Sequence, residues 1–139
     1  MSEKTSLSVL DQWHGIVNNV RGEYLSTTQN YPWIIGFSGG KDSTLVAHAV
    51  FEALMTMAPS QRTRPVHLVS NDTMVESPLV MSHLDEVTYL IDEAGRGLDL
   101  PITVARTKPD PDKTFWVLLI GKGYPSPNSS MRWCTDRLK

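Results

Sequence analysis

Apolar residues follow two different spacings along the chain, and these spacings predict helices and strands in turn. Residues 5–28 carry apolar side chains three or four positions apart, which is the repeat of a helix with one buried stripe. The same repeat returns over 42–57 and again between Ser77 and Gly97. In the first of these stretches it predicts a core-facing set, namely Leu45, Val46, Ala49, Ala53, Leu54 and Met57. Short apolar runs of strand length follow these helices, at 33–37, 65–70 and 101–107.

This order predicts an α/β fold in which helical crossovers join parallel strands. The run at 33–37 lacks polar residues at alternate positions, so we expect it to be buried on both faces. Such a strand belongs inside a doubly wound sheet, the middle layer of a three-layer sandwich. We expect ligands beyond the carboxyl ends of the strands, at a switch point beside 33–37.

The length of the chain predicts one domain over residues 1–139. A leading helix occupies 1–32, and the strand–helix–strand–helix–strand core occupies 33–107. The remainder, 108–139, contains a loop, a short helix at 113–120 and a motif with the only cysteine.

Two glycines stand between the first predicted strand and the helix that follows it. Gly39 and Gly40 let the backbone approach a ligand with no Cβ atom in the way. A helix start offers unpaired N–H groups and the positive end of its dipole. Lys41 adds a positive charge, and Ser38 and Ser43 add hydroxyl donors. The stretch therefore predicts a phosphate-binding loop.

The Walker A loop is the obvious competitor, and the sequence departs from it twice. Ile35 stands where that motif has its first glycine, and Asp42 stands where it has serine or threonine. The glycine pattern of dinucleotide-binding folds is also absent from the sequence.

Two carboxylates near the predicted site have two interpretations each. Asp42 either favours the helix start electrostatically or helps to hold Mg²⁺ beside a triphosphate, and both can be true. Asp72 and Thr73 follow the strand at 65–70. They either cap a loop, or Asp72 approaches the nucleotide or its metal.

Composition and charge limit the binding partners and the cellular compartment that we expect for the chain. The net charge of −2 argues against tight, unaided nucleic-acid binding. The single cysteine, Cys134, excludes an internal disulfide and suits a reducing compartment. No apolar run approaches the ~18 residues of a membrane span, and no secretory leader is evident, so we expect a cytoplasmic protein with no membrane partner. With Arg132 and Arg137 nearby, Cys134 is either a reactive thiolate or an inert buried thiol.

Six motifs in one order carry a resemblance to a known family. They are Tyr31-Pro32-Trp33, Ser38 to Ser43, Ser70 to Pro78, Thr114 to Val117, Gly123 to Asn128, and Arg132 to Lys139. The second resembles the phosphate loop of the PP-loop ATP pyrophosphatases, and Asp72-Thr73 resembles a pair in the phosphoadenylyl-sulfate (PAPS) reductases. Together the six resemble the DNA phosphorothioation sulfurtransferases of the DndC/SspD type.

The resemblance implies an adenine nucleotide alpha hydrolase-like fold and an enzyme that converts ATP to AMP and pyrophosphate. Residues 38–43, Asp72 and Thr73 would bind ATP, with Mg²⁺ held partly by Asp42 or Asp72. Lys41, Asp42 and Cys134 would be catalytic. The activated group would be a DNA backbone oxygen, which sulfur then replaces. The implied partners are a cysteine desulfurase and DNA, reached through a multi-protein complex.

In full-length relatives the resemblance also implies a 4Fe-4S cluster, with Cys134 as one ligand. A cluster of that kind needs about four thiolates, whereas this chain has one cysteine. Two other functions remain open. One is a PAPS reductase-like enzyme with Cys134 as its redox thiol, and the other is a nucleotide-binding module without catalysis.

The resemblance further implies a five-stranded sheet of order 3-2-1-4-5, whereas the chain predicts three strands. We therefore expect residues 1–139 to be the N-terminal part of a longer protein. The edge of 33–37 would then be covered by a second copy in a homodimer, or would promote aggregation.

Overall fold

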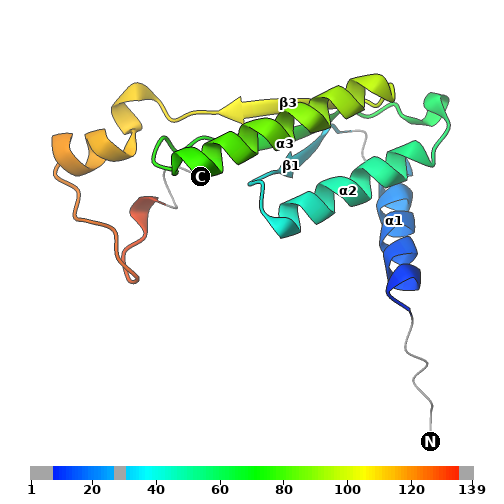
Figure 1. Cartoon of the computed structure of the whole chain (residues 1–139), viewed down its shortest axis with the longest axis horizontal. Helices are drawn as coiled ribbons and strands as arrows, with labels where there is room; N and C mark the ends of the chain where they lie inside the picture. The colour runs from blue at the N-terminus through cyan, green and yellow to red at the C-terminus, as the bar shows by residue number, and fades with distance from the viewer. Residues whose placement is uncertain (1–7, 27–30, 135–139) are drawn as a thin grey trace, which may run out of the picture.

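The computed structural model describes residues 8–26 and 31–134, and it combines a parallel sheet with helices (Figure 1). The order of elements agrees with the sequence prediction, and most boundaries move by one to three residues. In chain order the main elements are α1 Val9–Leu25, β1 Trp33–Gly36, α2 Lys41–Met55, β2 Val66–Asn71, α3 Pro78–Gly97 and β3 Ile102–Thr107. The predicted residues of the first helix at 5–7 and 27–28 lie outside the described residues.

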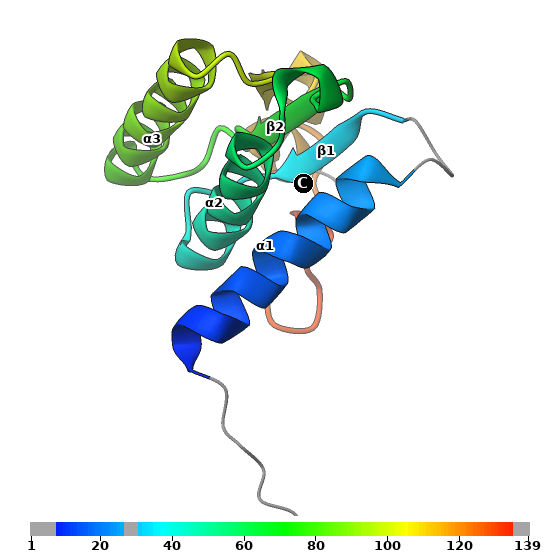
Figure 2. The ribbon, with the colours of Figure 1, turned by 90° about the vertical axis from the view of Figure 1, so that its right-hand side faces the viewer.

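The three strands are parallel and stand in the order β1-β2-β3. Ile35 pairs with Leu68, which in turn pairs with Val104. Each crossover moves the chain one strand further in the same direction, so right-handed connections bring α2 and α3 to the same face of the sheet. Figure 2 shows α1, α2 and α3 beside one another on that side.

The hydrophobic core lies between this helical layer and the sheet. Ile35 and Phe37, Leu68 from β2 and Ile102 from β3 are all buried. The helices contribute a buried set to the same cluster, namely Tyr24, Ala47, Val50, Leu54 and Leu84. The apolar side chains of neighbouring elements therefore fill one continuous core, which positions the loops at the carboxyl ends of the strands.

Two predictions about buried faces were wrong in part. Ile34 was expected to be buried, but its side chain is 75% exposed. Burial on both faces needs a covering layer on each side, and the described residues supply helices for one side only. In α2, Leu45 and Val46 were expected in the core but lie about half exposed, while Ala47 and Val50 take the buried positions.

The described sheet also differs from the expected doubly wound arrangement. A switch point beside β1 requires a strand on its other side, and no described residue forms one. Within 8–26 and 31–134 the fold is thus α/β with two layers rather than three.

α1 is attached to the rest of the molecule by polar contacts near both of its ends. The Tyr24 hydroxyl donates to the carbonyl of Arg64 at 2.7 Å and accepts from the Arg64 amide at 2.9 Å. At the other end of the helix, the Trp13 indole donates to the Glu52 carboxylate in α2 at 2.7 Å. A capping box between Ser8 and Asp11 starts the helix.

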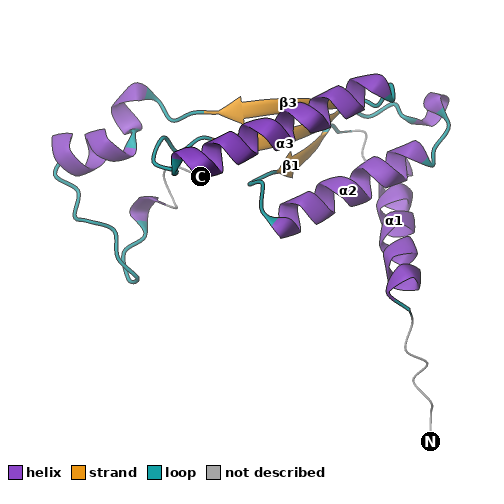
Figure 3. Ribbon diagram, in the orientation of Figure 1, coloured by secondary structure: helices purple, strands orange, loops and turns teal. Residues whose placement is uncertain are grey.

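The segment after β3 extends beyond the carboxyl ends of the strands (Figures 1 and 3). The single short helix expected at 113–120 is instead a 3₁₀ turn at Pro111–Lys113 followed by a helical turn whose last part, Val117–Gly121, is π-helical. Trp133 folds back on this segment by stacking on Phe115 and donating its indole N–H to the Pro125 carbonyl at 2.8 Å. Among the described helices, none has both the length and the apolar character needed to cross a membrane.

Candidate phosphate-binding site

The predicted phosphate loop lies between the end of β1 and the start of α2. Phe37 is buried in the core and anchors the loop, whereas Ser38 and Gly40 are exposed. Gly40 is the N-cap residue of α2, and no side chain caps the helix there. The first turn of α2 therefore presents its backbone N–H groups at the surface without a side-chain acceptor, which is the arrangement that attracts anions.

Hydrogen bonds within the loop hold it in one shape. The Ser43 hydroxyl donates to the Gly40 carbonyl at 3.0 Å and accepts from the Ser38 amide at 3.3 Å. Its oxygen also lies 3.2 Å from the Ser38 hydroxyl oxygen. Thr44 adds a second hydroxyl donor to the Gly40 carbonyl at 2.9 Å. Ser38 and Ser43, which were predicted as phosphate donors, thus also stabilise the loop itself.

Gly39 takes a backbone conformation that requires glycine. Its φ angle is +74°, in the left-handed region. Its carbonyl oxygen lies 3.3 Å from Nε2 of His83, and a Cβ atom at this position would stand 3.2 Å from Cδ1 of Leu84. The beginning of α3 therefore packs directly on the glycine loop.

A pocket of about 380 Å³ opens beside the loop, at the carboxyl ends of β1 and β2. Its lining combines apolar side chains with a few polar ones: Gly36, Phe37, Ser38, Val69, Asn71, Glu76, Val80 and Leu84. The predicted Ser38 is thus part of a concave surface, as ligand sites of α/β sheets require.

Lys41 and Asp42 occupy the first turn of α2, and both are exposed. Asp42 lies where a negative charge interacts favourably with the helix dipole. The ammonium group of Lys41 and the carboxylate of Asp42 are therefore accessible to a ligand at the helix start.

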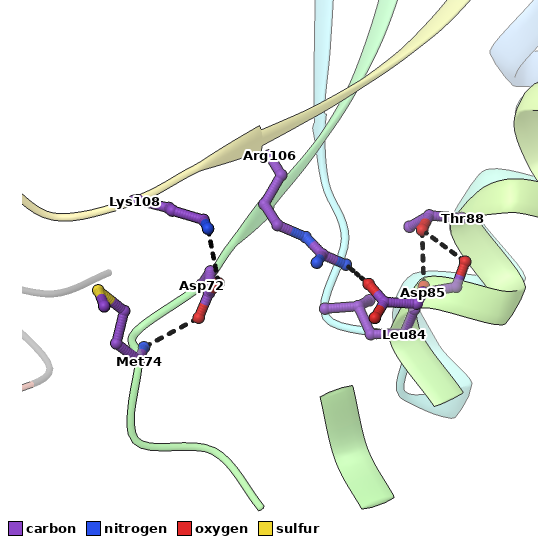
Figure 4. Close-up of polar contacts among 7 residues, drawn as sticks. All are labelled: Asp72, Met74, Leu84, Asp85, Thr88, Arg106 and Lys108. Atoms are coloured by element: carbon purple, nitrogen blue, oxygen red, sulfur yellow. Dashed lines mark hydrogen bonds and ion pairs between the residues drawn. The ribbon is translucent and has the colours of Figure 1, made fainter. Parts of the chain in front are cut away.

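Asp72 and Thr73 are buried and contact residues of the loop that follows β2. Figure 4 shows the contacts of Asp72. Asp72 accepts from the Met74 amide at 2.9 Å, and its other carboxylate oxygen lies 3.8 Å from Nζ of Lys108. Thr73 donates its hydroxyl to Glu76 at 3.1 Å. Of the two interpretations of Asp72, these contacts favour the structural one, because each of its carboxylate oxygens has a protein partner.

Three features near the site were not predicted from the sequence. Arg106 of β3 forms an ion pair with Asp85 of α3 at 2.5 Å (Figure 4). His83 contacts the glycine loop, and the Ser70 hydroxyl is buried with no hydrogen-bond partner among the described residues. The two contacts join residues far apart in the sequence, and the burial of the Ser70 hydroxyl depends on packing. No local motif could therefore have indicated any of the three features.

Cys134 is half-buried in the C-terminal segment, after the Trp133 indole that stacks on Phe115. Arg137, predicted to influence its thiol, lies outside the described residues, together with Thr135 and Asp136 of the same motif. Within 8–26 and 31–134, no three His, Cys, Asp or Glu side chains are grouped so that they could hold a metal ion.

Comparison of the chain with protein-family models, with curated proteins and with solved structures finds no match.

Proposed function

We propose that the chain is an ATP pyrophosphatase that binds the phosphates of ATP at the start of α2. The observation that carries this proposal is the uncapped N-terminus of α2, which follows the glycine loop and adjoins the 380 Å³ pocket. The nucleoside would occupy the pocket and the phosphates would lie along residues 38–43. The proposal includes the finer fold assignment, a PP-loop domain of the adenine nucleotide alpha hydrolase-like class.

The proposed chemistry is electrostatic. Cleavage between the α and β phosphates places negative charge on the departing pyrophosphate. Backbone N–H groups at the helix start, the helix dipole and the exposed Lys41 would stabilise that charge. No residue of the loop needs to form a covalent intermediate in this scheme.

The two carboxylates proposed for Mg²⁺ differ in how well they fit it. Mg²⁺ beside a nucleotide is usually held by one or two carboxylates together with phosphate oxygens. Asp42 fits this role, since it is exposed at the helix start. Asp72 fits it poorly, because its carboxylate contacts Met74 and Lys108. When bound, Mg²⁺ would neutralise phosphate charge.

An iron–sulfur cluster does not fit the residues of this chain. A 4Fe-4S cluster takes about four thiolate ligands, and Cys134 is the only cysteine in the sequence. We therefore assign no step of the proposed reaction to a cluster, and Cys134 remains a proposed catalytic thiol on the resemblance alone.

The acceptor that we propose for the activation step is a DNA backbone oxygen, on the strength of the six motifs that resemble the phosphorothioation enzymes. Adenylation would make this oxygen a leaving group that a sulfur nucleophile displaces. The sulfur would come from a cysteine desulfurase as a persulfide, whose outer sulfur would attack phosphorus and displace AMP. A second thiol would then cleave the S–S bond, leaving the phosphorothioate and a disulfide. Because the net charge is −2, we expect partner proteins to bring DNA to the site.

The test is to measure AMP and pyrophosphate formation from ATP, with and without DNA, in the wild-type protein and in Lys41→Ala. Loss of one charge-assisted phosphate contact costs about 1.5–3 kcal/mol, so we expect at least about a tenfold fall in turnover at subsaturating ATP. Lys122→Ala is the matched control, because Lys122 pairs with Asp112 away from the loop and should leave turnover unchanged.

Three outcomes would contradict the proposal. Recovery of intact ATP from the wild-type protein would indicate a binding module without catalysis. Reduction of a sulfonucleotide without pyrophosphate release from ATP would indicate the reductase function. Equal turnover in Lys41→Ala and the wild type would remove Lys41 from the site.

A further inference from the structure

We infer that His83 is a positioning residue that orients the phosphate loop by donating its Nε2–H to the Gly39 carbonyl. This inference rests on the proposed function, and it assigns to α3 a role in the same site. The distance between the two atoms is 3.3 Å, and 44 residues separate them in the sequence.

The direction of the Gly39 carbonyl matters because, in a trans peptide, the N–H of the following residue points to the opposite side. The carbonyl of Gly39 and the N–H of Gly40 belong to one planar unit. When His83 holds the carbonyl toward α3, the Gly40 N–H is turned away from α3. His83 therefore determines where one of the loop's donors points, without touching the phosphate.

The next peptide unit is oriented by α2 in the same way. The Gly40 carbonyl accepts from the Thr44 amide at 3.0 Å and from the hydroxyls of Ser43 and Thr44. The N–H of Lys41 is consequently turned away from the body of the helix. Two successive N–H groups thus have their directions set by two different helices.

Leu84 supports the contact between its neighbour His83 and Gly39. Its Cδ1 atom lies where a Cβ atom on Gly39 would be crowded, at 3.2 Å. Leu84 is 5% exposed and belongs to the core, so it provides a fixed surface against which Gly39 rests. His83 itself is exposed, which means that its side chain can be changed without opening the core.

The chemistry of the contact specifies which substitutions preserve it. A carbonyl accepts only, so Nε2 must carry a hydrogen. A glutamine side chain reaches a similar position with an amide N–H, whereas phenylalanine keeps the ring and lacks a donor. His83→Gln should therefore retain the orientation of the loop, and His83→Phe should lose it.

The experiment measures binding of α,β-methylene ATP and of inorganic pyrophosphate by calorimetry, in the wild-type protein, His83→Phe and His83→Gln. His14→Phe is the control, since His14 is an exposed histidine on α1. We expect His83→Phe to bind both ligands about 3- to 10-fold more weakly. His83→Gln and His14→Phe should stay within about twofold of the wild type, and all four proteins should melt at similar temperatures.

Amide hydrogen exchange of the ligand-free protein gives a second readout. Exchange across residues 38–43 should quicken in His83→Phe and not in His83→Gln. Wild-type affinity in His83→Phe, with unchanged exchange, would overturn the inference and leave the ATP site standing. Absence of binding to either ligand by the wild type would overturn both proposals.

Discussion

At the scale of single residues, the two glycines of the loop meet different requirements. Gly39 has a φ angle of +74° and lies against Leu84. Gly40 has an ordinary extended conformation, with φ −79°, and a Cβ atom there would meet only the Ser38 hydroxyl at 3.5 Å. Gly39 is therefore needed for the fold of the loop, whereas Gly40 leaves room for an approaching ligand.

This difference predicts that Gly39→Ala destabilises the protein. A non-glycine residue in the left-handed region costs about 1–2 kcal/mol, and the crowding against Leu84 adds to this. Gly15→Ala is the matched control, because Gly15 lies within α1 with nothing near its added Cβ atom. Replacing glycine in a helix interior should stabilise by about 0.5–1 kcal/mol.

Urea denaturation followed by circular dichroism gives the free energy of unfolding of both variants. The expected result is a change of opposite sign in the two proteins. A Gly39→Ala variant as stable as the wild type would show that the loop can adopt another conformation at no cost.

The residues of the site differ in how readily the sequence predicts them. Gly39, Gly40 and Lys41 were predictable because a strand, a glycine turn and a helix start follow one another within a few positions. His83 was not, because its contact with Gly39 depends on how α3 packs. Asp72 stays a predicted site residue, and its partners Met74 and Lys108 become apparent only in the folded chain.

At the scale of elements, α1 is joined to the start of β2 by one buried tyrosine. Tyr24 is 2% exposed, and its hydroxyl bonds to both the amide and the carbonyl of Arg64. Its ring also meets Trp33 edge-on, with centroids 5.4 Å apart. One side chain therefore satisfies two backbone groups and contacts β1 at the same time.

Tyr24→Phe should destabilise the protein by about 1–3 kcal/mol, because the amide and carbonyl of Arg64 lose their partner where water has little access. Thermal unfolding is the measurement. Tyr89→Phe is the control, since Tyr89 is 61% exposed and its change should stay within about 0.5 kcal/mol. Equal melting temperatures for the two variants would contradict the role given to Tyr24.

Burial of the Tyr24 phenol also makes stability depend on alkaline pH. Burial raises the pKa of Tyr24 above its ordinary value, so the folded state holds the phenolic proton more tightly than the unfolded chain does. The stability gained in this way is present below about pH 10 and declines as the pH rises further. In Tyr24→Phe, the free energy of unfolding should therefore fall less steeply above about pH 10 than it does in the wild type, because the variant has no phenol to ionise at this position.

The elements themselves were easier to predict than the faces that they bury. All three strands and the three long helices were expected, because apolar spacing marks them locally. The buried stripe of α2 was predicted only in part: Ala49, Ala53 and Leu54 are buried as expected, whereas Leu45 and Val46 are about half exposed. Which face of an apolar helix is covered depends on its neighbours, and spacing alone does not contain that information.

At the scale of the whole molecule, one face of the sheet and one edge of β1 have no cover within residues 8–26 and 31–134. The amides of Trp33 and Phe37 donate to the carbonyls of Pro65 and Val69 in the neighbouring chain segment. Because successive N–H groups of a strand point to opposite edges, the amides of Ile34 and Gly36 point toward the free edge. On the uncovered face, Ile34 is 75% exposed. An unpaired apolar edge of this kind is a template for pairing with another chain.

We therefore predict that the protein self-associates through β1 and that Ile34→Lys prevents this. A lysine on an edge strand carries a charge that neighbouring copies repel and that a paired sheet would have to desolvate. Ile120→Lys is the matched control. Ile120 is 76% exposed, almost the same as Ile34, but lies in the segment after β3, so its replacement should leave association unchanged.

Sedimentation velocity over a hundredfold range of protein concentration distinguishes the outcomes. The wild type and Ile120→Lys should shift to larger species as concentration rises, while Ile34→Lys should sediment as a monomer throughout. The two lysine variants carry the same added charge, so a difference between them isolates the contribution of β1 from that of net charge. A wild-type protein that remains monomeric at every concentration would show that the edge of β1 is protected without a second copy.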